Sequence, residues 1–425
     1  MKKILIFTVT AGNGHNACAK GMKNKLESMG QDIEVKLVDL LKSYSTALNT
    51  WVADGGYNFA VSKMPISYNY FYNHYKKSKP EHRYTCAAQG TVMSTIEGVL
   101  REILEFKPDV IYCTHFYPAM AISNLRLYYD IPCKVIVSNL DYVNSPFWEA
   151  TIGVDYFAIP NEDFIEECIE EGFSRGQLMP IGLPVDERTL LEVDKAAARR
   201  ELGLDENLPT IMVMFGGGFW SGGFKIFKDL IDCLKGRKVQ VIMINGKNKK
   251  GFDKIEKMKF EDGIKVVNVG FTNKVPYYMS AADFIINKFG GTSVTEMINK
   301  HLPMVITEKL PEQERYNLVY MKEKGVAVSF KNKKELKQHV LNLIDNPEIL
   351  QSMREKISPL RKNTINELAE FMLSLPQADY SKVEQDIDFK KVKKLVKKRM
   401  LEENKKEIKN AKQKGQKKKL EKVGG

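Results

Sequence analysis

Short apolar strands alternate with helix-length segments along most of this chain, and this alternation constrains its fold more than any other feature. In the first half of the chain, the expected strands span residues 3–8, 33–38, 109–113, 134–138 and 156–159. Strands that are separated by a helix cannot pair as hairpins, so they lie parallel in one sheet. Residues 1–185 therefore predict a doubly wound α/β domain.

A second series of the same kind begins at Thr210. Its expected strands span residues 211–215, 239–244, 264–269, 284–286, 304–306 and 327–328. The segment Gly182-Leu183-Pro184-Val185 marks the change between the series, so we expect a second domain over residues 186–374. A chain of 425 residues is long enough for two such cores. The pattern favours the GT-B architecture, in which two Rossmann-like, doubly wound domains face each other across a cleft.

The positive charge of the chain is concentrated in its C-terminal tail. The formal net charge is +12, and residues 381–425 hold 17 Lys and Arg against 7 Asp and Glu, a net +10. Apolar residues recur at helical spacing at Phe389, Val392, Leu395 and Val396, and beyond them little but charge remains. We expect residues 375–425 to form a Lys-rich tail that is helical or disordered.

Other features of composition exclude several classes of protein. No run approaches the roughly 20 apolar residues of a membrane span. The short apolar N-terminal run leads directly into a glycine loop, which fits a first strand better than a signal peptide. The six cysteines show no CxxC spacing. Buried thiols are therefore expected, rather than disulfides or a zinc site.

The segment after the expected strand at 284–286 suits a nucleotide-sugar. Gly290, Gly291 and Thr292 form a small-residue turn before a helix, and Glu296 follows one turn into that helix. Backbone N–H groups at a helix N-terminus attract phosphate, and glycines allow close approach. An anion site alone would not require Glu296, whereas a carboxylate there could bind sugar hydroxyls. The pattern indicates a glycosyltransferase.

Two further loops follow expected strands in the second half. The loop with Gly216, Gly217 and Gly218 comes after the first strand of that half and precedes a helix. Gly270 and Phe271 end a later strand, where backbone groups could hold a uracil edge. Neither loop is diagnostic by itself.

Two histidines follow strands in the first half. Gly12-Asn13-Gly14-His15 joins the first strand to a helix, and His15 could take a proton from an acceptor hydroxyl. A purely structural turn is the alternative for this loop. His115 follows the strand at 109–113, where a role in capping the next helix is as reasonable as a role in acceptor binding.

Residues 57–79 mix tyrosines and phenylalanines with lysines. Amphipathic rings beside lysines suit a surface that lies on a bilayer. Stacking on nucleic acid is the rival interpretation, although no nucleic-acid motif accompanies the segment. A partly buried helix with ordinary core aromatics is a third.

The order of these motifs resembles the family of the monogalactosyldiacylglycerol synthases and bacterial processive diacylglycerol glucosyltransferases. The resemblance covers residues 1 to about 374. Its elements are the loop 12–15, the aromatic segment 65–75, Lys107-Pro108-Asp109, the linker 182–185, and the two donor motifs over 288–296 and 311–317.

The resemblance implies an inverting, metal-independent glycosyltransferase of the GT28 type that needs no cofactor beyond its UDP-hexose substrate. His15 is the expected catalytic base. The expected donor-binding residues are Gly216, Gly217, Gly218, Phe271, Lys288, Gly290, Gly291, Thr292, Glu296, Gln313, Glu314 and Asn317. The expected acceptor-binding residues are Gly14, His115, Asp141, Tyr68, Phe71 and Tyr72.

The chain departs from the family pattern at several positions. Asp141 and Trp148 match it, but Ser145 stands where the family often has a histidine, and Phe289 replaces a usual proline. The basic tail is a further departure. These differences bear on the acceptor and the sugar more than on the type of reaction.

We therefore expect transfer of a hexose, with glucose favoured and galactose possible, from a UDP-sugar to diacylglycerol or a glycosyl-diacylglycerol. The enzyme would be cytoplasmic and peripheral on the inner face of the cell membrane, with the tail attracted to anionic lipid and with no nucleic-acid partner. A polyprenyl-linked or other glycolipid acceptor is one alternative. A non-catalytic UDP-sugar-binding protein is another, and an epimerase on the same fold would leave the aromatic segment without a use.

Overall fold

The computed structural model describes residues 1–10, 14–44, 69–70, 73, 86–145, 148–215, 222–383, 388–392, 394–396 and 398. The described chain forms two compact units. Unit 1 comprises residues 1–140, 144–182 and 366–425, and unit 2 comprises residues 141–143 and 183–365. Each unit contains one parallel sheet.

The sheet of unit 1 has the strand order β2-β1-β3-β4-β5-β6, and every pair is parallel. Its strands are β1 (Lys2–Thr8), β2 (Ile33–Asp39), β3 (Val110–Cys113), β4 (Lys134–Ser138), β5 (Tyr156–Ala158) and β6 (Leu178–Met179). The expected strands are confirmed, and only the two-residue β6 was not expected. The buried, β-branched sequences of β3 and β4 are typical of central parallel strands that are covered on both faces.

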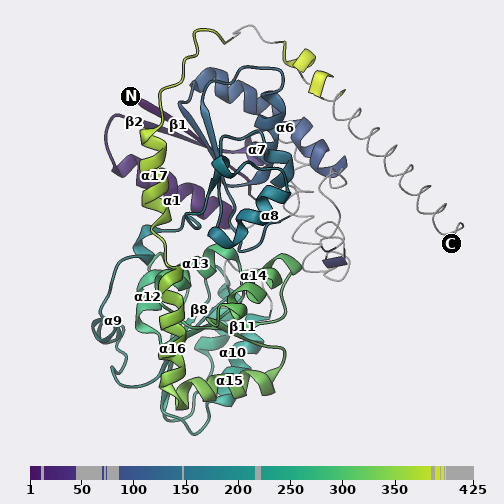
Figure 1. Cartoon of the computed structure of the whole chain (residues 1–425). Coiled ribbons are helices and arrows are strands. Elements are labelled where there is room, and N and C mark those ends of the chain that lie inside the picture. Colours follow the sequence, from purple (N-terminus) through teal and green to yellow (C-terminus); the bar gives the residue numbers. More distant parts are fainter. Residues whose placement is uncertain are drawn as a thin grey trace, which may run out of the picture. The chain divides into compact units, whose positions relative to one another are not determined.

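Helices cover both faces of this sheet (Figure 1). The chain runs from β1 to β2 in one direction along the sheet and from β2 to β3 in the other, so right-handed crossovers place α1 and α6 on opposite faces. The helices of unit 1 are α1 (Gly14–Ser28), α2 (Leu40–Tyr44), α6 (Cys86–Phe106), α7 (Phe116–Leu125) and α8 (Ile165–Glu170), together with α17 (Thr364–Ser374), whose first two residues belong to unit 2.

The sheet of unit 2 has the order β12-β11-β10-β7-β8-β9 and is also parallel throughout. Its strands are β7 (Thr210–Met214), β8 (Val239–Ile244), β9 (Ile264–Val269), β10 (Phe284–Asn287), β11 (Met304–Thr307) and β12 (Ala327–Phe330). All of them were expected from the sequence. One face of the sheet packs on a core that includes Phe227, Leu230 and Val340.

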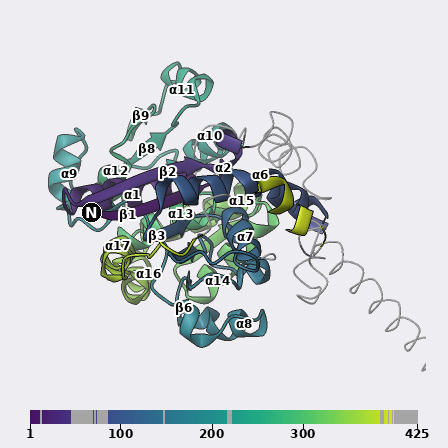
Figure 2. The same ribbon diagram turned by 90° about the horizontal axis from the view of Figure 1, so that it is seen from above.

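Unit 2 has helices between its strands and after the last one. They are α9 (Lys195–Glu201), α10 (Gly223–Cys233), α11 (Lys249–Glu256), α12 (Val275–Ala281), α13 (Gly291–Asn299), α14 (Glu312–Glu323), α15 (Lys333–Asp345) and α16 (Pro347–Ile357). Helix α11 lies beside β9 at the edge of the sheet (Figure 2). The two units together confirm the expected α/β class with two doubly wound sheets.

Each sheet has one point where the strand order reverses. In unit 1 this switch point lies between β1 and β3, and in unit 2 it lies between β7 and β10. Ligands of doubly wound sheets bind outside the carboxyl ends of the strands at such points. The fold therefore directs attention to the segments after β1, β3, β7 and β10.

The end of α17 and the residues after it belong to unit 1, whereas the sequence favoured a second domain that runs to residue 374. The ring of Phe371 in α17 meets that of Tyr156 at 4.9 Å, edge to face. The Ala378 N–H donates to Asp109 Oδ1 at 2.9 Å, and the Tyr380 hydroxyl donates to the Pro108 carbonyl at 2.9 Å. These contacts join residues that lie far apart in the sequence, which explains why the order of the elements suggested another boundary.

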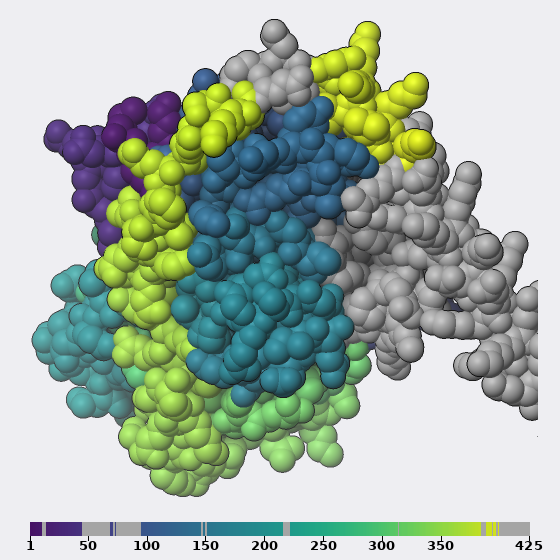
Figure 3. Space-filling model, turned by 45° about the horizontal axis from the view of Figure 1, so that its top comes forward, coloured from purple at the N-terminus to yellow at the C-terminus, as the bar shows by residue number. Residues whose placement is uncertain are grey.

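Part of the Lys-rich tail also packs on unit 1. Residues 389–392 are helical, and Val392 and Val396 are 1% and 0% exposed. The Arg101 guanidinium lies 5.0 Å from the ring centroid of Phe389, and the Tyr128 hydroxyl donates to the Leu395 carbonyl at 3.4 Å. Figure 3 shows the residues after α17, in yellow, against the surface of unit 1. Residues 399–425 lie outside the described residues.

Burial of Val392 and Val396 predicts how the tail is attached. Replacing Val396 with Asp would place an unpaired charge in an apolar contact, so we expect residues 388–398 to detach. Limited trypsin digestion should then cleave this segment at least about tenfold faster, because proteolysis follows the population of the open form. The thermal unfolding of the rest of the chain should change little.

Leu395→Asp is the matched control, because the side chain of Leu395 is 36% exposed. It should leave the cleavage rate near that of the unsubstituted chain. Equal cleavage of the Val396→Asp variant and the unsubstituted chain would contradict the docked tail.

Candidate functional site

The segment between β10 and α13 in unit 2 has the geometry of an anion site. Gly290 is the N-cap of α13, and no side chain of the described residues caps this helix end. The N–H groups of the first turn, at Gly291, Thr292 and Ser293, have no acceptor within the helix. A Cβ built at Gly290 would meet only Glu314 Oε1, at 3.9 Å, and the φ of −75° suits any residue. The protein itself does not require a glycine there, so its absent side chain leaves space for an incoming group.

A buried amide positions this segment. Asn317 is 0% exposed, and its Nδ2 donates to the Phe289 carbonyl at 3.2 Å and to Asp141 Oδ1 at 2.9 Å. Its Oδ1 accepts the Tyr142 N–H at 2.7 Å. Asn317 was expected to bind the donor, but these protein partners use its amide, so it is a positioning residue. Asp141, expected on the acceptor side, belongs with Tyr142 to unit 2.

Two charged side chains flank the same segment. Lys288 Nζ lies 2.8 Å from Glu314 Oε1. Among the described residues, Glu314 Oε2 is buried and has no hydrogen-bond partner. A buried carboxylate oxygen without a donor is costly for the folded state. A ligand hydroxyl is the kind of group that would satisfy it.

Glu296 lies further along α13, beside the ion pair of Asp186 and Arg188. Burial and the nearby Asp186 carboxylate raise the pKa of Glu296 to about 7, while Arg188 opposes the shift. Asp186 and Arg188 are joined by several hydrogen bonds, including Arg188 Nε to Asp186 Oδ1 at 2.9 Å. Within the described part of the chain, the Glu296 carboxylate accepts no hydrogen bond. It is therefore poised to accept one from a ligand hydroxyl.

Of the other residues predicted to bind the donor, one has a described side chain and the rest lie outside the described residues or side chains. Phe271 follows the edge strand β9, is 74% exposed and has Lys247 Nζ 5.8 Å from its ring centroid. The contact of this segment with the uracil of the donor stays a prediction. Gly216, Gly217 and Gly218 lie outside the described residues, as does the side chain of Gln313.

In unit 1, His15 lies at the switch point as the second residue of α1. Its Nδ1 is hydrogen-bonded to the Thr114 carbonyl at the end of β3. A carbonyl only accepts, so Nδ1 carries the proton and Nε2 of the neutral ring has a free lone pair. The Thr114 hydroxyl donates to Thr8 Oγ1 at 2.9 Å, which ties the ends of β1 and β3 together. The arrangement orients the ring and leaves Nε2 able to accept a proton.

His115 lies next to His15, with ring centroids 4.7 Å apart. Burial lowers the pKa of His15, although the bond to Thr114 opposes this shift. Burial, together with His15, lowers the pKa of His115 well below its usual value. Both rings are therefore neutral at pH 7, and His15 is in the form that accepts a proton.

The structure assigns His115 a capping role, one of the two interpretations that its position allowed. It is the N-cap of α7, and its Nδ1 accepts the Tyr117 N–H at 3.1 Å. Its side chain is buried, and its ring stacks on Phe116 with centroids 4.3 Å apart. A contact with an acceptor stays a prediction for His115. Gly14 begins α1 beside His15, whereas Tyr68, Phe71 and Tyr72 lie outside the described residues.

Several residues of these sites were not expected from the sequence. Thr114 and Asn16 orient the loop with His15, since Asn16 Nδ2 donates to Thr10 Oγ1 at 2.9 Å and the Thr8 hydroxyl donates to Asn16 Oδ1 at 3.1 Å. Asp186 and Arg188 flank Glu296. The sequence offers only one sign of these four residues, which is that each lies one to three residues from a recognised motif.

Searches for a metal cluster and a membrane span gave no candidate among the described residues. No group of three or more His, Cys, Asp or Glu is arranged to hold a metal ion in that part of the chain. No described helix combines the length and the hydropathy needed to cross a bilayer. The cysteines whose side chains are described, Cys18, Cys113, Cys133, Cys168 and Cys233, are buried free thiols, as expected.

Two family models match the chain in succession. Residues 15–185 match the model described as monogalactosyldiacylglycerol (MGDG) synthase. Residues 210–372 match the glycosyltransferase family 28 C-terminal domain. The first match includes His15 and His115, and the second includes the segment from Lys288 to Asn317.

Curated relatives carry names from the same family. A processive diacylglycerol beta-glucosyltransferase of Staphylococcus saprophyticus is 27% identical over 365 residues, which cover 85% of this chain and 89% of the relative. A probable chloroplastic monogalactosyldiacylglycerol synthase of Nicotiana tabacum is 26% identical over 356 residues, which cover 79% of this chain and 63% of that protein.

Solved structures share the fold at low identity. MurG of Acinetobacter baumannii matches 88% of this chain and 99% of its own, with a TM-score of 0.60 and 13% identity. The spinosyn rhamnosyltransferase SpnG, complexed with thymidine diphosphate, matches 88% of this chain with a TM-score of 0.57 and 8% identity. These matches confirm the GT-B fold class.

The raised pKa of Glu296 predicts a pH-dependent cost in stability. A carboxyl group whose pKa rises from 4.5 in the unfolded chain to about 7 in the folded chain binds more protons when folded, so stability falls as pH rises between these values. We expect Glu296→Gln to raise the melting temperature at pH 8 relative to the unsubstituted chain, and to change it little at pH 4. Thermal unfolding at the two pH values measures the difference.

Glu335→Gln is a suitable comparison, because Glu335 lies in the exposed first turn of α15 and bonds Asn332 and Lys331. It should give no such gain at pH 8. A Glu296→Gln variant that is less stable than the unsubstituted chain at pH 8 would argue against the buried, destabilised carboxylate.

Proposed function

The chain belongs to the GT28-type glycosyltransferase family of the monogalactosyldiacylglycerol synthases and processive diacylglycerol glucosyltransferases, and we propose that it transfers a hexose from a UDP-sugar to diacylglycerol or a glycosyl-diacylglycerol. The family makes the chain a hexosyltransferase. The donor, the acceptor and the choice of glucose over galactose belong to the proposal. The observation that carries it is the uncapped N-terminus of α13 with Lys288, Glu296 and Glu314 around it.

The donor-side residues of unit 2 have complementary tasks in this proposal. The free N–H groups at the start of α13 and the Lys288 ammonium hold the diphosphate and stabilise the charge that grows on it as UDP leaves. Glu296 accepts hydrogen bonds from the ribose, and Glu314 Oε2 accepts one from the hexose. Charge stabilisation by these groups requires no metal ion, which is the expectation that we retain for this enzyme.

The acceptor side of the proposal uses the histidine of unit 1. The acceptor oxygen attacks the anomeric carbon on the face opposite to UDP, the bond from that carbon to the UDP oxygen breaks, and the configuration inverts. His15 Nε2 takes the proton of the acceptor hydroxyl in the same step. The Thr114 carbonyl, which accepts from Nδ1, stabilises the imidazolium that forms.

We also place the enzyme on the inner face of the cell membrane, where a lipid acceptor resides. The contact is supported by the docked part of the tail. Val392 and Val396 are buried against unit 1, while the lysines of the same segment are exposed, namely Lys390, Lys391, Lys394 and Lys398. A basic residue near an anionic leaflet contributes about 1 kcal/mol of attraction. The packing of the two valines thus holds these four lysines on unit 1, the unit that would receive the lipid.

His15→Gln tests the chemistry. Loss of the general base should lower kcat by about 10²–10⁴-fold. UDP binding and thermal unfolding should be preserved, because the substitution lies outside unit 2. UDP release from each UDP-hexose in the presence of diacylglycerol vesicles, with the lipid product identified by mass, measures both activity and specificity.

His339→Asn in α15 serves as the histidine control and should keep full activity. A His15→Gln enzyme with near-normal kcat would refute the assignment of the base. Transfer to a polyprenyl-linked lipid but not to diacylglycerol would refute the proposed acceptor, and UDP-sugar binding without any turnover would favour the non-catalytic alternative.

Membrane attachment is tested by changing the four exposed tail lysines to Gln. At about 1 kcal/mol each, their loss should weaken binding to vesicles that contain phosphatidylglycerol by about a thousandfold. Co-sedimentation measures this, and binding to pure phosphatidylcholine should be weak for both proteins.

The charge-matched control changes four exposed lysines of unit 2, namely Lys249, Lys250, Lys334 and Lys337. It should bind anionic vesicles as the unsubstituted chain does. If both quadruple variants bind equally well, the tail is not the anchor.

A further inference from the structure

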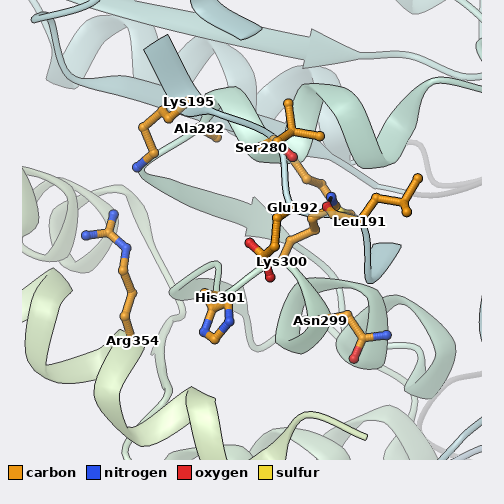
Figure 4. Close-up of a pocket in the computed structure, with 11 residues that line it drawn as sticks. Leu191, Glu192, Lys195, Ser280, Ala282, Asn299, Lys300, His301 and Arg354 are labelled. Atoms are coloured by element: carbon orange, nitrogen blue, oxygen red, sulfur yellow. Dashed lines mark hydrogen bonds between the residues drawn. The ribbon is translucent and has the colours of Figure 1, made fainter. Parts of the chain in front are cut away.

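A second polar pocket lies in unit 2 at the opposite end of α13 from the donor segment. It has a volume of about 270 Å³. Lys195, Asn299, Lys300, His301 and Arg354 contribute side chains to it from α9, from the end of α13 and from α16 (Figure 4). None of these residues takes part in the proposed transfer.

The pocket has more positive than negative charge. On one side, Lys195 Nζ and Arg199 Nη2 lie 3.0 and 2.7 Å from the carboxylate of Asp283, and Arg354 Nη2 lies 3.9 Å from it. Three cations therefore share one carboxylate. Burial lowers the pKa of Lys195 and of Arg354, and the nearby Asp283 carboxylate opposes this shift.

On the other side, the counter-ion is displaceable. Glu192 lies 2.9 Å from Arg361 Nη2, but its own side chain is 80% exposed. An exposed ion pair of this kind contributes little free energy. Lys300 Nζ donates to the Leu191 carbonyl at 2.6 Å, and no carboxylate of the described residues lies within hydrogen-bond distance of this ammonium. An incoming anion would replace the Glu192 carboxylate beside Lys300 and Arg361 at small cost.

A buried acceptor gives the pocket a second property. Asn299 is 3% exposed, and its Nδ2 donates to Thr189 Oγ1 at 3.0 Å. Its Oδ1 is buried and has no hydrogen-bond partner among the described residues. An unsatisfied acceptor favours a ligand that brings a donor. Cations together with a free acceptor suit an anion that carries a hydroxyl group.

One residue that lines this pocket, His301, has a strained backbone. His301 has a φ of +50°, in the left-handed region that glycine or asparagine usually occupies after a helix. The Leu302 N–H donates to the Met297 carbonyl at 2.9 Å, which closes the helix end around this residue. The strain places the imidazole against Arg361, whose Nη1 donates to His301 Nε2 at 2.6 Å. The imidazole of His301, which lines the pocket, is thus held in place by Arg361, and a glycine would offer no such side chain.

We propose that this pocket binds a small phosphate ester of a polyol, with the phosphate at Lys300 and Arg354 and a hydroxyl group at Asn299. The size of the pocket suits a ligand of a few carbon atoms. Helix α13 connects it to the donor segment, since Asn299 and Gly291 are the two ends of one helix. Binding does not depend on the proposed transfer, because no donor-side residue contacts the ligand.

Calorimetric titration of the full chain with glycerol phosphate, inorganic phosphate and glycerol, at constant ionic strength, tests the proposal. Glycerol phosphate should bind saturably and more tightly than inorganic phosphate, and glycerol should not bind. Lys300→Gln should weaken glycerol phosphate binding by about tenfold, the effect of one charge-assisted hydrogen bond. His301→Gly should keep the fold, because glycine suits this backbone conformation, and it should also weaken binding because the pocket loses the imidazole that lines it.

Two lysine variants serve as controls. Lys235→Gln, at an exposed position outside the pocket, should bind as the unsubstituted chain does. Lys288→Gln removes a cation of the donor segment and should also leave binding unchanged. Loss of binding in Lys288→Gln but not in Lys300→Gln would assign the phosphate to the donor segment and overturn the proposal. Absence of saturable binding, or equal affinities for glycerol phosphate and inorganic phosphate, would overturn it as well.

Discussion

The buried amide of Asn317 is the interaction on which the donor side of this protein depends. One side chain fixes the Phe289 carbonyl in the segment before α13, and the same side chain fixes Asp141 and the Tyr142 N–H, which lie far away in sequence. The Tyr142 hydroxyl then meets Thr295 Oγ1 within α13 at 3.0 Å. The helix N-terminus is therefore positioned from two directions. An amide buried without partners would be costly, so the arrangement forms as a whole or not at all.

One electrostatic rule acts in both units, because burial disfavours the charged form of an ionisable group. In unit 1, burial keeps His15 and His115 neutral, so a lone pair is available at neutral pH. In unit 2, burial destabilises the charged form of Glu296, and no donor of the described residues compensates the carboxylate. The pKa values of these groups are therefore shifted from their ordinary values. Such shifts are common where a protein binds or transforms a ligand.

The sequence predicted the strands and the segments that follow them, because apolar periodicity and glycine turns are local signals. It could not reveal the partners of those segments. Asn317 matched a donor motif, yet its amide bonds to Asp141 and Tyr142, which no pattern connects to it. His115 allowed two interpretations until the Tyr117 N–H was found on its Nδ1. The valines of the tail showed helical spacing, but nothing in that spacing indicated which surface they cover. Long-range contacts decided each of these cases.

The return of the chain to unit 1 through α17 has a consequence for synthesis. Unit 2 is built almost entirely from one continuous stretch, residues 183–365, whereas unit 1 needs residues from both ends of the chain. Lys2 in the first strand donates to the Leu375 carbonyl, and Asp109 accepts a hydrogen bond from the Ala378 N–H. Residues 366–378 must therefore leave the ribosome before unit 1 can be completed. Until then the nascent sheet of unit 1 lacks these contacts, and incompletely packed apolar surface favours aggregation and chaperone binding during translation.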